Sequence, residues 1–255
     1  MSLTAIIGGS GFDTFEELSV SDALFQDTPY GSHSGPILQG CISDNDCIFL
    51  PRHGVGHRYP PHVVNYRANI WMLKQLGVSQ IIAFNVVGGI NCTMSPDTIV
   101  IPDQIIDYTS GREHTFFDGD QDKLSEQGLP AVEHIDFTHP YAPELRKKLI
   151  QFFYKYDIDC VEHGVYGCTQ GPRLESASEI ERYRRDGCDM VGMTGMPEAA
   201  LAKELGIDYV SVAIVVNWAA GVSAEMLSMI EIMSTVKKNM KSIKTQLPEL
   251  LRFLS

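Results

Sequence analysis

Short runs of consecutive apolar residues alternate along this chain with longer segments in which apolar positions recur at helical spacing. An uninterrupted apolar run of about four to eight residues is typical of a strand that is buried on both faces of a sheet. The runs predict strands at residues 3–7, 81–87, 98–101, 188–191 and 209–216, and a hairpin-like pair at 36–38 and 46–50.

The segments between these runs have the pattern of amphipathic helices. Within residues 63–76, Val64, Ala68 and Leu76 fall near the helical period, and Gly77 ends the pattern. Helices are also predicted at 143–154, at 197–205 with Pro197 in the first turn and Gly206 at the end, and over most of 223–251. Strands that alternate with helices predict an α/β fold built around a largely buried sheet.

Residues 107–138 are the least regular part of the chain, rich in Gly, Asp and aromatic residues. A loop of this length in a compact domain favours a segment that covers a site or meets a partner. A disordered excursion is the alternative interpretation.

Composition narrows the class of protein. The chain has 255 residues, of which 44% are hydrophobic and 20% charged, which fits one large domain over residues 1–255; length alone leaves two small domains open. No stretch approaches the roughly 18 apolar residues of a membrane span, and the N-terminal residues lack the pattern of an export signal. The net charge of −12 disfavours a nucleic-acid partner but permits a local phosphate pocket.

The six cysteines are scattered and form no C-x-x-C pair. Without an export signal, this distribution predicts reduced thiols in a cytoplasmic protein. Buried thiols are a better interpretation than metal ligands.

A glycine-rich turn follows the first predicted strand, at residues 8–11, and includes Ser10. Its backbone amides and the Ser10 hydroxyl could converge on an anion. A dinucleotide site or a plain tight turn would have a similar sequence. The dinucleotide fingerprint needs a third glycine, however, and Thr14 stands at that position.

Two other strand ends carry polar residues that suit a phosphate. Arg52 and His53 follow an apolar run, and a guanidinium matches the geometry of phosphate oxygens. Thr194 lies between a predicted strand and a predicted helix, where amides and a hydroxyl can hold an anion. The alternatives are a surface arginine with a packing histidine, and a simple helix cap.

Six motifs in a fixed order give the chain a family resemblance. They are Gly8-Gly-Ser-Gly11, Arg52-His53, Asn65-Tyr-Arg-Ala-Asn-Ile-Trp71, Asn85-Val-Val-Gly-Gly-Ile90, Gly171-Pro-Arg-Leu-Glu175 and Met193-Thr-Gly-Met-Pro-Glu198. With these motifs the sequence resembles the trimeric purine nucleoside phosphorylase and methylthioadenosine phosphorylase family over essentially its whole length. The resemblance implies a single-domain α/β phosphorylase fold with a central mixed sheet flanked by helices.

The same resemblance implies an activity and an assembly. Inorganic phosphate, as co-substrate, would cleave a nucleoside to a free purine and a pentose 1-phosphate, with no metal or organic cofactor. The protein would be a homotrimer with its sites near subunit boundaries.

The resemblance also assigns roles to individual residues. The phosphate would be bound by Ser10, Arg52, His53, Thr194 and the backbone of Val86. The nucleoside would be bound by Leu174, Glu175, Met193, Asn217, Trp218 and Ala219. Among these, Met193 would lie against the ribose, and Leu174 replaces a phenylalanine that usually packs on the base.

The identity of the base follows from donors and acceptors. Family members that act on 6-aminopurines usually have Asp at position 217 and a second Asp at 219, where this chain has Asn217 and Ala219. An Asn amide can donate to the purine O6 and accept from a protonated N7. Glu175 can accept from the N1–H of a 6-oxopurine, so Asn217 and Glu175 favour that class. Two polar residues satisfied by the backbone are the alternative.

The sugar is addressed by Met229, which matches a position where 6-oxopurine enzymes of the family generally carry a histidine. A thioether favours a 5′-methylthio group over a hydroxyl, and His134 of a neighbouring subunit would help to close this pocket. An ordinary core contact is the other interpretation of Met229. We therefore expect phosphorolysis of 5′-methylthioinosine; inosine or guanosine phosphorolysis, methylthioadenosine phosphorolysis, a nicotinamide-dependent oxidoreductase and a non-catalytic purine sensor are the alternatives.

Overall fold

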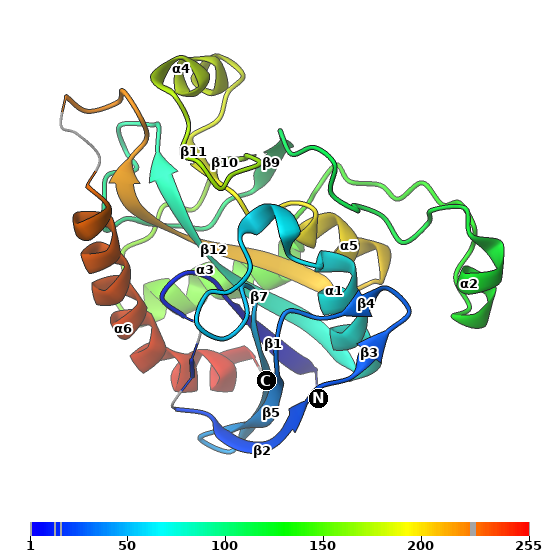
Figure 1. Ribbon diagram of the computed structural model, residues 1–255. Coiled ribbons are helices and arrows are strands. Elements are labelled where there is room, and N and C mark those ends of the chain that lie inside the picture. The colour runs from blue at the N-terminus through cyan, green and yellow to red at the C-terminus, as the bar shows by residue number, and fades with distance from the viewer. Residues whose placement is uncertain (1, 13, 16, 225–227, 255) are drawn as a thin grey trace.

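A ten-stranded mixed sheet forms the centre of the computed structural model, which describes residues 2–12, 14–15, 17–224 and 228–254 (Figure 1). Its strands are β1 (Leu3–Gly8), β2 (Ser19–Leu24), β5 (Ile37–Ile42), β6 (Asn45–Pro51), β7 (Val78–Gly89), β8 (Ile99–Val100), β9 (Gln104–Asp107), β10 (Val165–Cys168), β11 (Met190–Gly192) and β12 (Asp208–Trp218). The short strands β3 (Asp27–Thr28) and β4 (Gly31–Ser32) form a separate pair.

The middle of the sheet is parallel. Strand β1 pairs in parallel with β6 and β7, and β12 pairs in parallel with β7. The register sets Gly8 beside Pro51 and Asn217 beside Gly88. The carboxyl ends of these four strands therefore meet at one edge of the sheet, which is where open α/β sheets place their ligands.

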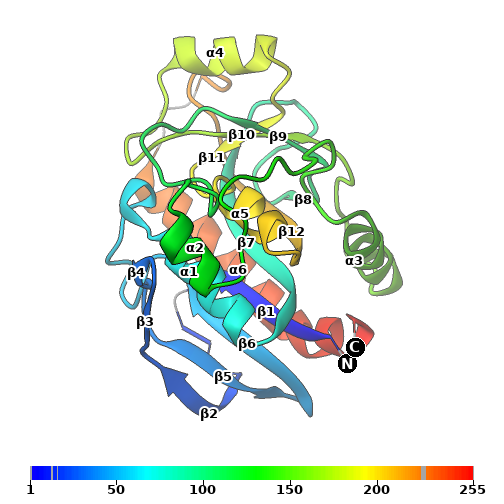
Figure 2. The ribbon, with the colours of Figure 1, turned by 90° about the vertical axis from the view of Figure 1, so that its right-hand side faces the viewer.

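Helices cover both faces of the sheet (Figures 1 and 2). On one face lie α1 (Tyr66–Gln75) and α5 (Glu198–Glu204), and on the other lie α3 (Pro143–Lys155) and α6 (Met229–Leu254). Successive residues of β1 serve opposite faces: Ile7 belongs to the first core and Ile6 to the second, and both are fully buried. Burial of one such side chain stabilises the fold by about 1.5–3 kcal/mol, which explains why the central strands are apolar at most positions.

The predicted strands are all present, although most are longer than their apolar runs. The helix predicted at 63–76 begins later than expected. Residues Pro61–Val63 form a 3₁₀ turn, and Asn65 caps α1, because its side chain accepts a hydrogen bond from the Ala68 amide at 3.1 Å. Pro197 occupies the cap position before α5 instead of its first turn. In the helix predicted at 223–251, residues 225–227 lie outside the described residues, and α6 begins at Met229.

Several elements were not predicted, among them β2, β9, β10, helix α4 (Ala177–Arg185) and the short pair β3–β4. Strand β2 is mostly exposed and β10 has only four residues, so neither forms a long apolar run. Helix α4 does carry a sequence signal: Ser176 and Glu179 form a capping box, in which each side chain bonds the other residue's amide.

The irregular segment 107–138 contains helix α2 (Gln121–Glu126), and its second half forms an arm at the side of the molecule (Figure 1), where Tyr30 and Trp71 both donate to Gln127 at 3.0 and 3.1 Å. Its first half is attached to the body of the protein, since Thr115 and the Phe116 amide both donate to the Glu204 carboxylate at 2.7 Å. None of the described helices is long and apolar enough to cross a membrane.

Candidate active site

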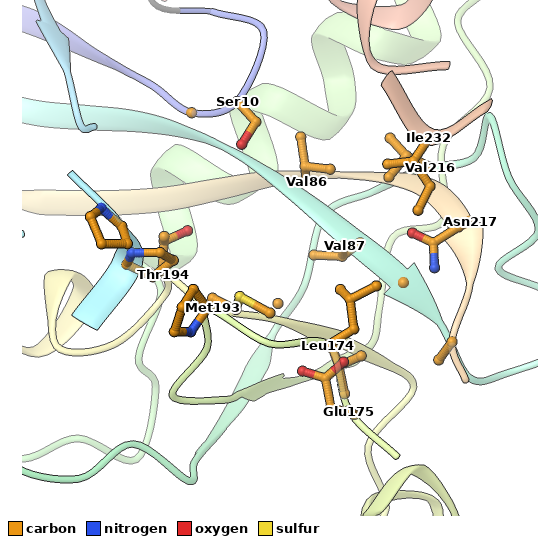
Figure 3. A pocket seen from close by; sticks show the side chains of 18 of the residues that line it. Ser10, Val86, Val87, Leu174, Glu175, Met193, Thr194, Val216, Asn217 and Ile232 are labelled. Atoms are coloured by element: carbon orange, nitrogen blue, oxygen red, sulfur yellow. The ribbon is translucent and has the colours of Figure 1, made fainter. Parts of the chain in front are cut away.

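A cavity of about 390 Å³ lies where the carboxyl ends of the central strands meet. Figure 3 shows its side chains arriving from segments far apart in the sequence. The residues predicted to bind phosphate all line it: Ser10, Arg52, His53, Val86 and Thr194. So do most of those predicted to bind the nucleoside: Leu174, Glu175, Met193, Asn217, Ala219 and Met229.

The turn after β1 needs its glycines for two different reasons. Gly11 has a φ of +76°, a backbone conformation that favours glycine. At Gly9, a Cβ atom would meet the Phe84 carbonyl oxygen at 2.7 Å and Arg52 Nη1 at 3.0 Å. The missing side chain lets Arg52 lie directly beneath the turn that carries Ser10.

Arg52 is fully buried, so the alternative of a surface arginine is wrong. Its Nε and Nη2 each donate to a different oxygen of Glu198 at 2.7 Å, and Nη1 donates to the Phe84 carbonyl at 3.0 Å. The burial itself disfavours the charged guanidinium, but the adjacent Glu198 carboxylate raises the pKa of Arg52 above its ordinary value. Because the Nε hydrogen and one Nη2 hydrogen are bonded to Glu198, an anion can be bound only by the remaining hydrogens of Nη1 and Nη2.

His53 follows Arg52 and is 5% exposed. Its Nδ1 lies 2.7 Å from the Tyr59 carbonyl oxygen, and its ring stacks on His57, with centroids 4.2 Å apart. Burial, together with the nearby Arg52 charge, lowers the pKa of His53 to about 3. The imidazole is therefore neutral at neutral pH. Since a carbonyl only accepts, Nδ1 carries the hydrogen.

Thr194 follows β11 and is held by a buried polar chain. Ser211 donates to Asn85 Oδ1 at 2.9 Å, and Asn85 Nδ2 donates to the Thr194 hydroxyl oxygen at 2.8 Å. The alternative of a simple helix cap is wrong, because α5 has no side-chain cap and Thr194 bonds Asn85. The hydroxyl hydrogen of Thr194 is left for another acceptor, either a ligand in the cavity or the neighbouring buried Tyr166 hydroxyl.

At the opposite end of the cavity, Asn217 and Glu175 face the same space (Figure 3). The pairing of β12 with β7 shifts register between Val215 and Asn217. Consecutive strand residues normally point to opposite faces, and this bulge explains how Val216 and Asn217 both reach the cavity.

The two polar groups at this end have unused hydrogen-bonding capacity. Asn217 donates one amide hydrogen to the Trp218 carbonyl at 2.7 Å, which leaves its second hydrogen and its oxygen. Glu175 accepts from the Thr169 hydroxyl at 2.6 Å through Oε1, which leaves Oε2. No carboxylate stands beside Asn217 at position 219, where the side chain is that of buried Ala219.

The wall between the two ends is apolar. It includes Met193, Met229 at the start of α6, and Ile232 one turn further along that helix. Met229 is 59% exposed, which argues against the ordinary core contact considered from the sequence. Ile232 was not predicted as a site residue, although the spacing of three residues after Met229 places it on the same helix face.

Two predicted site residues do not line this cavity. Trp218 follows Asn217 on the strand and lines a neighbouring hollow of about 790 Å³ with Cys92 and Arg184, and its assignment to the nucleoside pocket stays a prediction. It also lines a smaller hollow of about 170 Å³ together with Asn217 and Ile232. His134 is exposed on the arm formed by residues 129–139, and its role in a neighbouring subunit stays a prediction.

Arg112 is a buried residue that sequence reasoning missed. Its Nη1 donates to the carbonyls of Met193 at 2.9 Å and Met196 at 2.6 Å, and its Nη2 donates to those of Thr169 and Gln170 at 3.2 and 2.9 Å. One guanidinium thus ties the segment before Glu175 to the segment that carries Thr194. An arginine in an irregular loop gives no sequence signal of this kind, because its partners are backbone carbonyls.

One end of the cavity has donors that suit an anion, and the other end has the polar side chains of Asn217 and Glu175, which suit a planar ligand with polar edges. Within the described part of the chain, no group of three or more His, Cys, Asp or Glu residues is arranged to hold a metal ion. All six cysteines are thiols, three of them buried.

Known proteins resemble this chain along nearly its whole length. Residues 4–252 match the family model of the phosphorylase superfamily. A probable S-methyl-5'-thioinosine phosphorylase of Pseudomonas syringae pv. tomato is 48% identical over 98% of this chain and 99% of its own length. A 6-oxopurine nucleoside phosphorylase of Pyrococcus furiosus is 46% identical over 95% of this chain and 89% of its own. The structure of methylthioadenosine phosphorylase from Schistosoma mansoni in complex with adenine matches with a TM-score of 0.92 and 32% identity, over 100% of this chain and 92% of that one.

Proposed function

The chain belongs to the phosphorylase superfamily, and we propose that it cleaves S-methyl-5′-thioinosine with inorganic phosphate, giving hypoxanthine and 5-methylthioribose 1-phosphate. The observation that carries the proposal is the pairing of Asn217 and Glu175 at one end of a cavity whose other end holds Ser10, Arg52 and Thr194. The Pseudomonas syringae relative is named for this activity.

The base is recognised through its oxo edge. The second amide hydrogen of Asn217 donates to O6 of hypoxanthine, and its oxygen accepts from N7 when that atom is protonated. The unused oxygen of Glu175 accepts from N1–H. An adenine base offers no hydrogen at N1 and a donor in place of O6, so it would leave buried polar groups unpaired.

The sugar lies between the two ends, against the apolar wall. Met229 and Ile232 give the 5′ side of the wall a thioether and an aliphatic chain. An apolar methylthio group is favoured there over a hydroxyl, which would lose its hydrogen bonds to water.

The reaction needs no nucleophile from the protein, because phosphate attacks the anomeric carbon itself. The C–N bond to the base breaks as the new C–O bond forms, and the pentose passes through an oxocarbenium-like state. Asn217 stabilises the leaving base as N7 takes up a proton, and Glu175 orients it. The protein therefore accelerates the reaction by positioning the two substrates and by stabilising the charges of the transition state, which account for most of the rate enhancement in such catalysis.

The proposal includes the assembly and its location. The chain forms one domain over residues 1–255 and a homotrimer in which the arm with His134 reaches a neighbouring site, in the cytoplasm. Two observations support this: His134 is exposed on its own chain, and all six cysteines are thiols. A solution mass of one chain, measured by light scattering, would contradict the trimer.

A second candidate is phosphorolysis of inosine and guanosine, which the Pyrococcus furiosus relative favours. It shares the oxo-edge contacts and differs only at the 5′ position. Methylthioadenosine phosphorolysis, as named for the Schistosoma mansoni structure, is a third.

Steady-state kcat/KM values for methylthioinosine, inosine and methylthioadenosine, with and without phosphate, test these candidates together. We expect phosphate-dependent release of hypoxanthine from methylthioinosine with the highest kcat/KM. Equal or faster turnover of methylthioadenosine would contradict the roles of Asn217 and Glu175, and faster turnover of inosine would contradict that of Met229. Binding of a purine with no turnover would indicate a sensor, and thermal stabilisation by a dinucleotide but not by phosphate would indicate an oxidoreductase.

A further inference from the structure

His53 differs from the other polar residues at the phosphate end of the cavity. Its Nδ1–H is committed to the Tyr59 carbonyl at 2.7 Å. The bond to Tyr59 is the one hydrogen bond of the ring within the described part of the chain, which leaves Nε2 for a ligand in the cavity that the ring lines. In this tautomer Nε2 carries a lone pair and can only accept.

The surroundings of the ring keep it neutral. The Arg52 guanidinium is its neighbour in the chain, and His57 stacks on its face. The carboxylate of Glu198 is already bonded by Arg52 and by the Tyr209 hydroxyl at 2.8 Å, so it is not available to a protonated imidazole. The low pKa of His53, about 3, agrees with this arrangement.

The remaining polar groups at this end donate to an anion. Arg52 has only donors, and the oxygen of Thr194 already accepts from Asn85, which leaves its hydrogen. The Ser10 hydroxyl can rotate to serve either role. His53 is therefore the one side chain among these four that offers an acceptor and nothing else.

We propose that His53 makes this site select an oxyanion that carries a proton, and so distinguishes hydrogen phosphate from sulfate. The inference rests on the proposed function, since it concerns the phosphate co-substrate. At neutral pH inorganic phosphate keeps at least one P–O–H hydrogen, which donates to His53 Nε2. Sulfate carries no hydrogen, so one of its oxygens would face the Nε2 lone pair unless the ring took up a proton.

Calorimetric titration of the intact protein near neutral pH tests the selection. The probes are phosphate, arsenate, sulfate and monofluorophosphate. Arsenate keeps a proton, whereas monofluorophosphate is a dianion of similar shape that has none. We expect phosphate and arsenate to bind more tightly than the two unprotonated anions by roughly tenfold or more. Titration in two buffers of different ionisation enthalpy should show close to one additional proton taken up with sulfate compared with phosphate.

Comparable affinities for all four anions, with no extra proton uptake, would overturn the proposal. These measurements need no turnover, so they separate its failure from failure of the proposed function. A protein that prefers phosphate but cleaves no nucleoside would contradict only the latter.

The variant His53→Gln tests whether His53 is the source of the preference for phosphate over sulfate. A glutamine amide can donate to either anion, so the preference for phosphate over sulfate should fall to within about threefold. A purely structural role would weaken both anions equally and leave the preference intact, which would overturn the assignment. His163→Gln, at an exposed histidine beside Asp103, is the matched control and should behave as the unaltered protein. If His53→Gln does not fold, the two-buffer measurement on the unaltered protein still decides.

Discussion

The Asn85 side chain donates through Nδ2 to the Thr194 hydroxyl oxygen at 2.8 Å, so the hydroxyl hydrogen of Thr194 must point to another acceptor. Ser211 fixes the orientation of the same amide by donating to its oxygen at 2.9 Å. All three side chains are buried. This series of hydrogen bonds, from Ser211 on β12 through Asn85, fixes the orientation of the Thr194 hydroxyl at the phosphate end of the cavity.

Replacing Asn85 with alanine should impair phosphate binding more than nucleoside binding. The variant leaves two buried hydroxyls without their partner, and we expect the free energy of unfolding to fall by about 1–3 kcal/mol. The KM for phosphate should rise roughly tenfold, while the KM for nucleoside changes little. Asn239→Ala, which removes an exposed amide bonded to Asp97, is the control. Equal increases of both KM values would contradict a directed role for Thr194.

The Arg52–Glu198 pair predicts a large effect on stability. Both side chains are almost fully buried, at 0% and 1% exposure. Glu198→Gln removes the charge that compensates the guanidinium, and loss of one partner of a buried pair costs about 3–5 kcal/mol. Chemical denaturation should show this loss, whereas Glu249→Gln, in an exposed pair with Arg252, should change stability by less than about 1 kcal/mol. Similarly small decreases in the free energy of unfolding of both variants would contradict a large stabilising role for the Arg52–Glu198 pair.

The order of strands and helices was predictable because burial on two faces makes each central strand a continuous apolar run. Elements with little burial were missed. Strand β2 is exposed along nearly its whole length, and β10 is too short to form a pattern. The start of α1 was placed too early, since Val63 and Val64 continue the apolar pattern although Asn65 caps the helix.

Within the site, the sequence identified residues that face the ligand and missed those that hold them. Arg112 stands in no motif, and the motif that ends at Glu198 does not show that Glu198 pairs with Arg52, because each residue acts on a partner at least 80 residues away in the chain. Trp218 does not line the cavity of Asn217 and Glu175, and the bulge one residue earlier in β12, which changes which side chains reach that cavity, has no sequence signal. A sequence pattern shows neither such a bulge nor the hydrogen bonds from Nε and Nη2 of Arg52 to Glu198.

Asn217→Asp tests whether Asn217 determines which purine base is bound. A carboxylate at this position repels O6 of hypoxanthine and accepts from the amino group of adenine. We expect the ratio of kcat/KM for methylthioinosine over methylthioadenosine to fall by roughly 10- to 100-fold. Asn45→Asp, at the start of β6, is the control. An unchanged ratio in the Asn217 variant would show that this side chain does not read the base.

Met229→His tests the 5′ pocket. An imidazole in place of the exposed thioether can bond a 5′-hydroxyl, which a methylthio group cannot use. The kcat/KM for inosine relative to methylthioinosine should rise roughly tenfold. Met233→His, one turn later on α6 and outside the cavity lining, is the control. No change in the Met229 variant would mean that the 5′ group lies elsewhere in the cavity.

The neutral imidazole of His53 predicts an acid-sensitive fold. Its pKa is lowered to about 3 in the native state by burial and by Arg52, whereas an unfolded histidine titrates near ~6.5. Above that pH both states are neutral and the group contributes no pH dependence. As pH falls from ~6.5 towards 3, only the unfolded state binds the proton, so stability is lost, by about 2 kcal/mol at pH ~5.

Urea unfolding at pH ~7 and pH ~5 measures this loss, and in His53→Gln the difference between the two pH values should shrink by about 2 kcal/mol. Burial also lowers the pKa of His33, which adds acid sensitivity of the same sign, but it is present in both proteins and cancels in the comparison. His163→Gln serves again as the control, because its side chain is 72% exposed. Parallel pH dependences in the unaltered protein and the His53 variant would mean that the ring takes up a proton in the folded state, and that His53 is not held as a neutral acceptor.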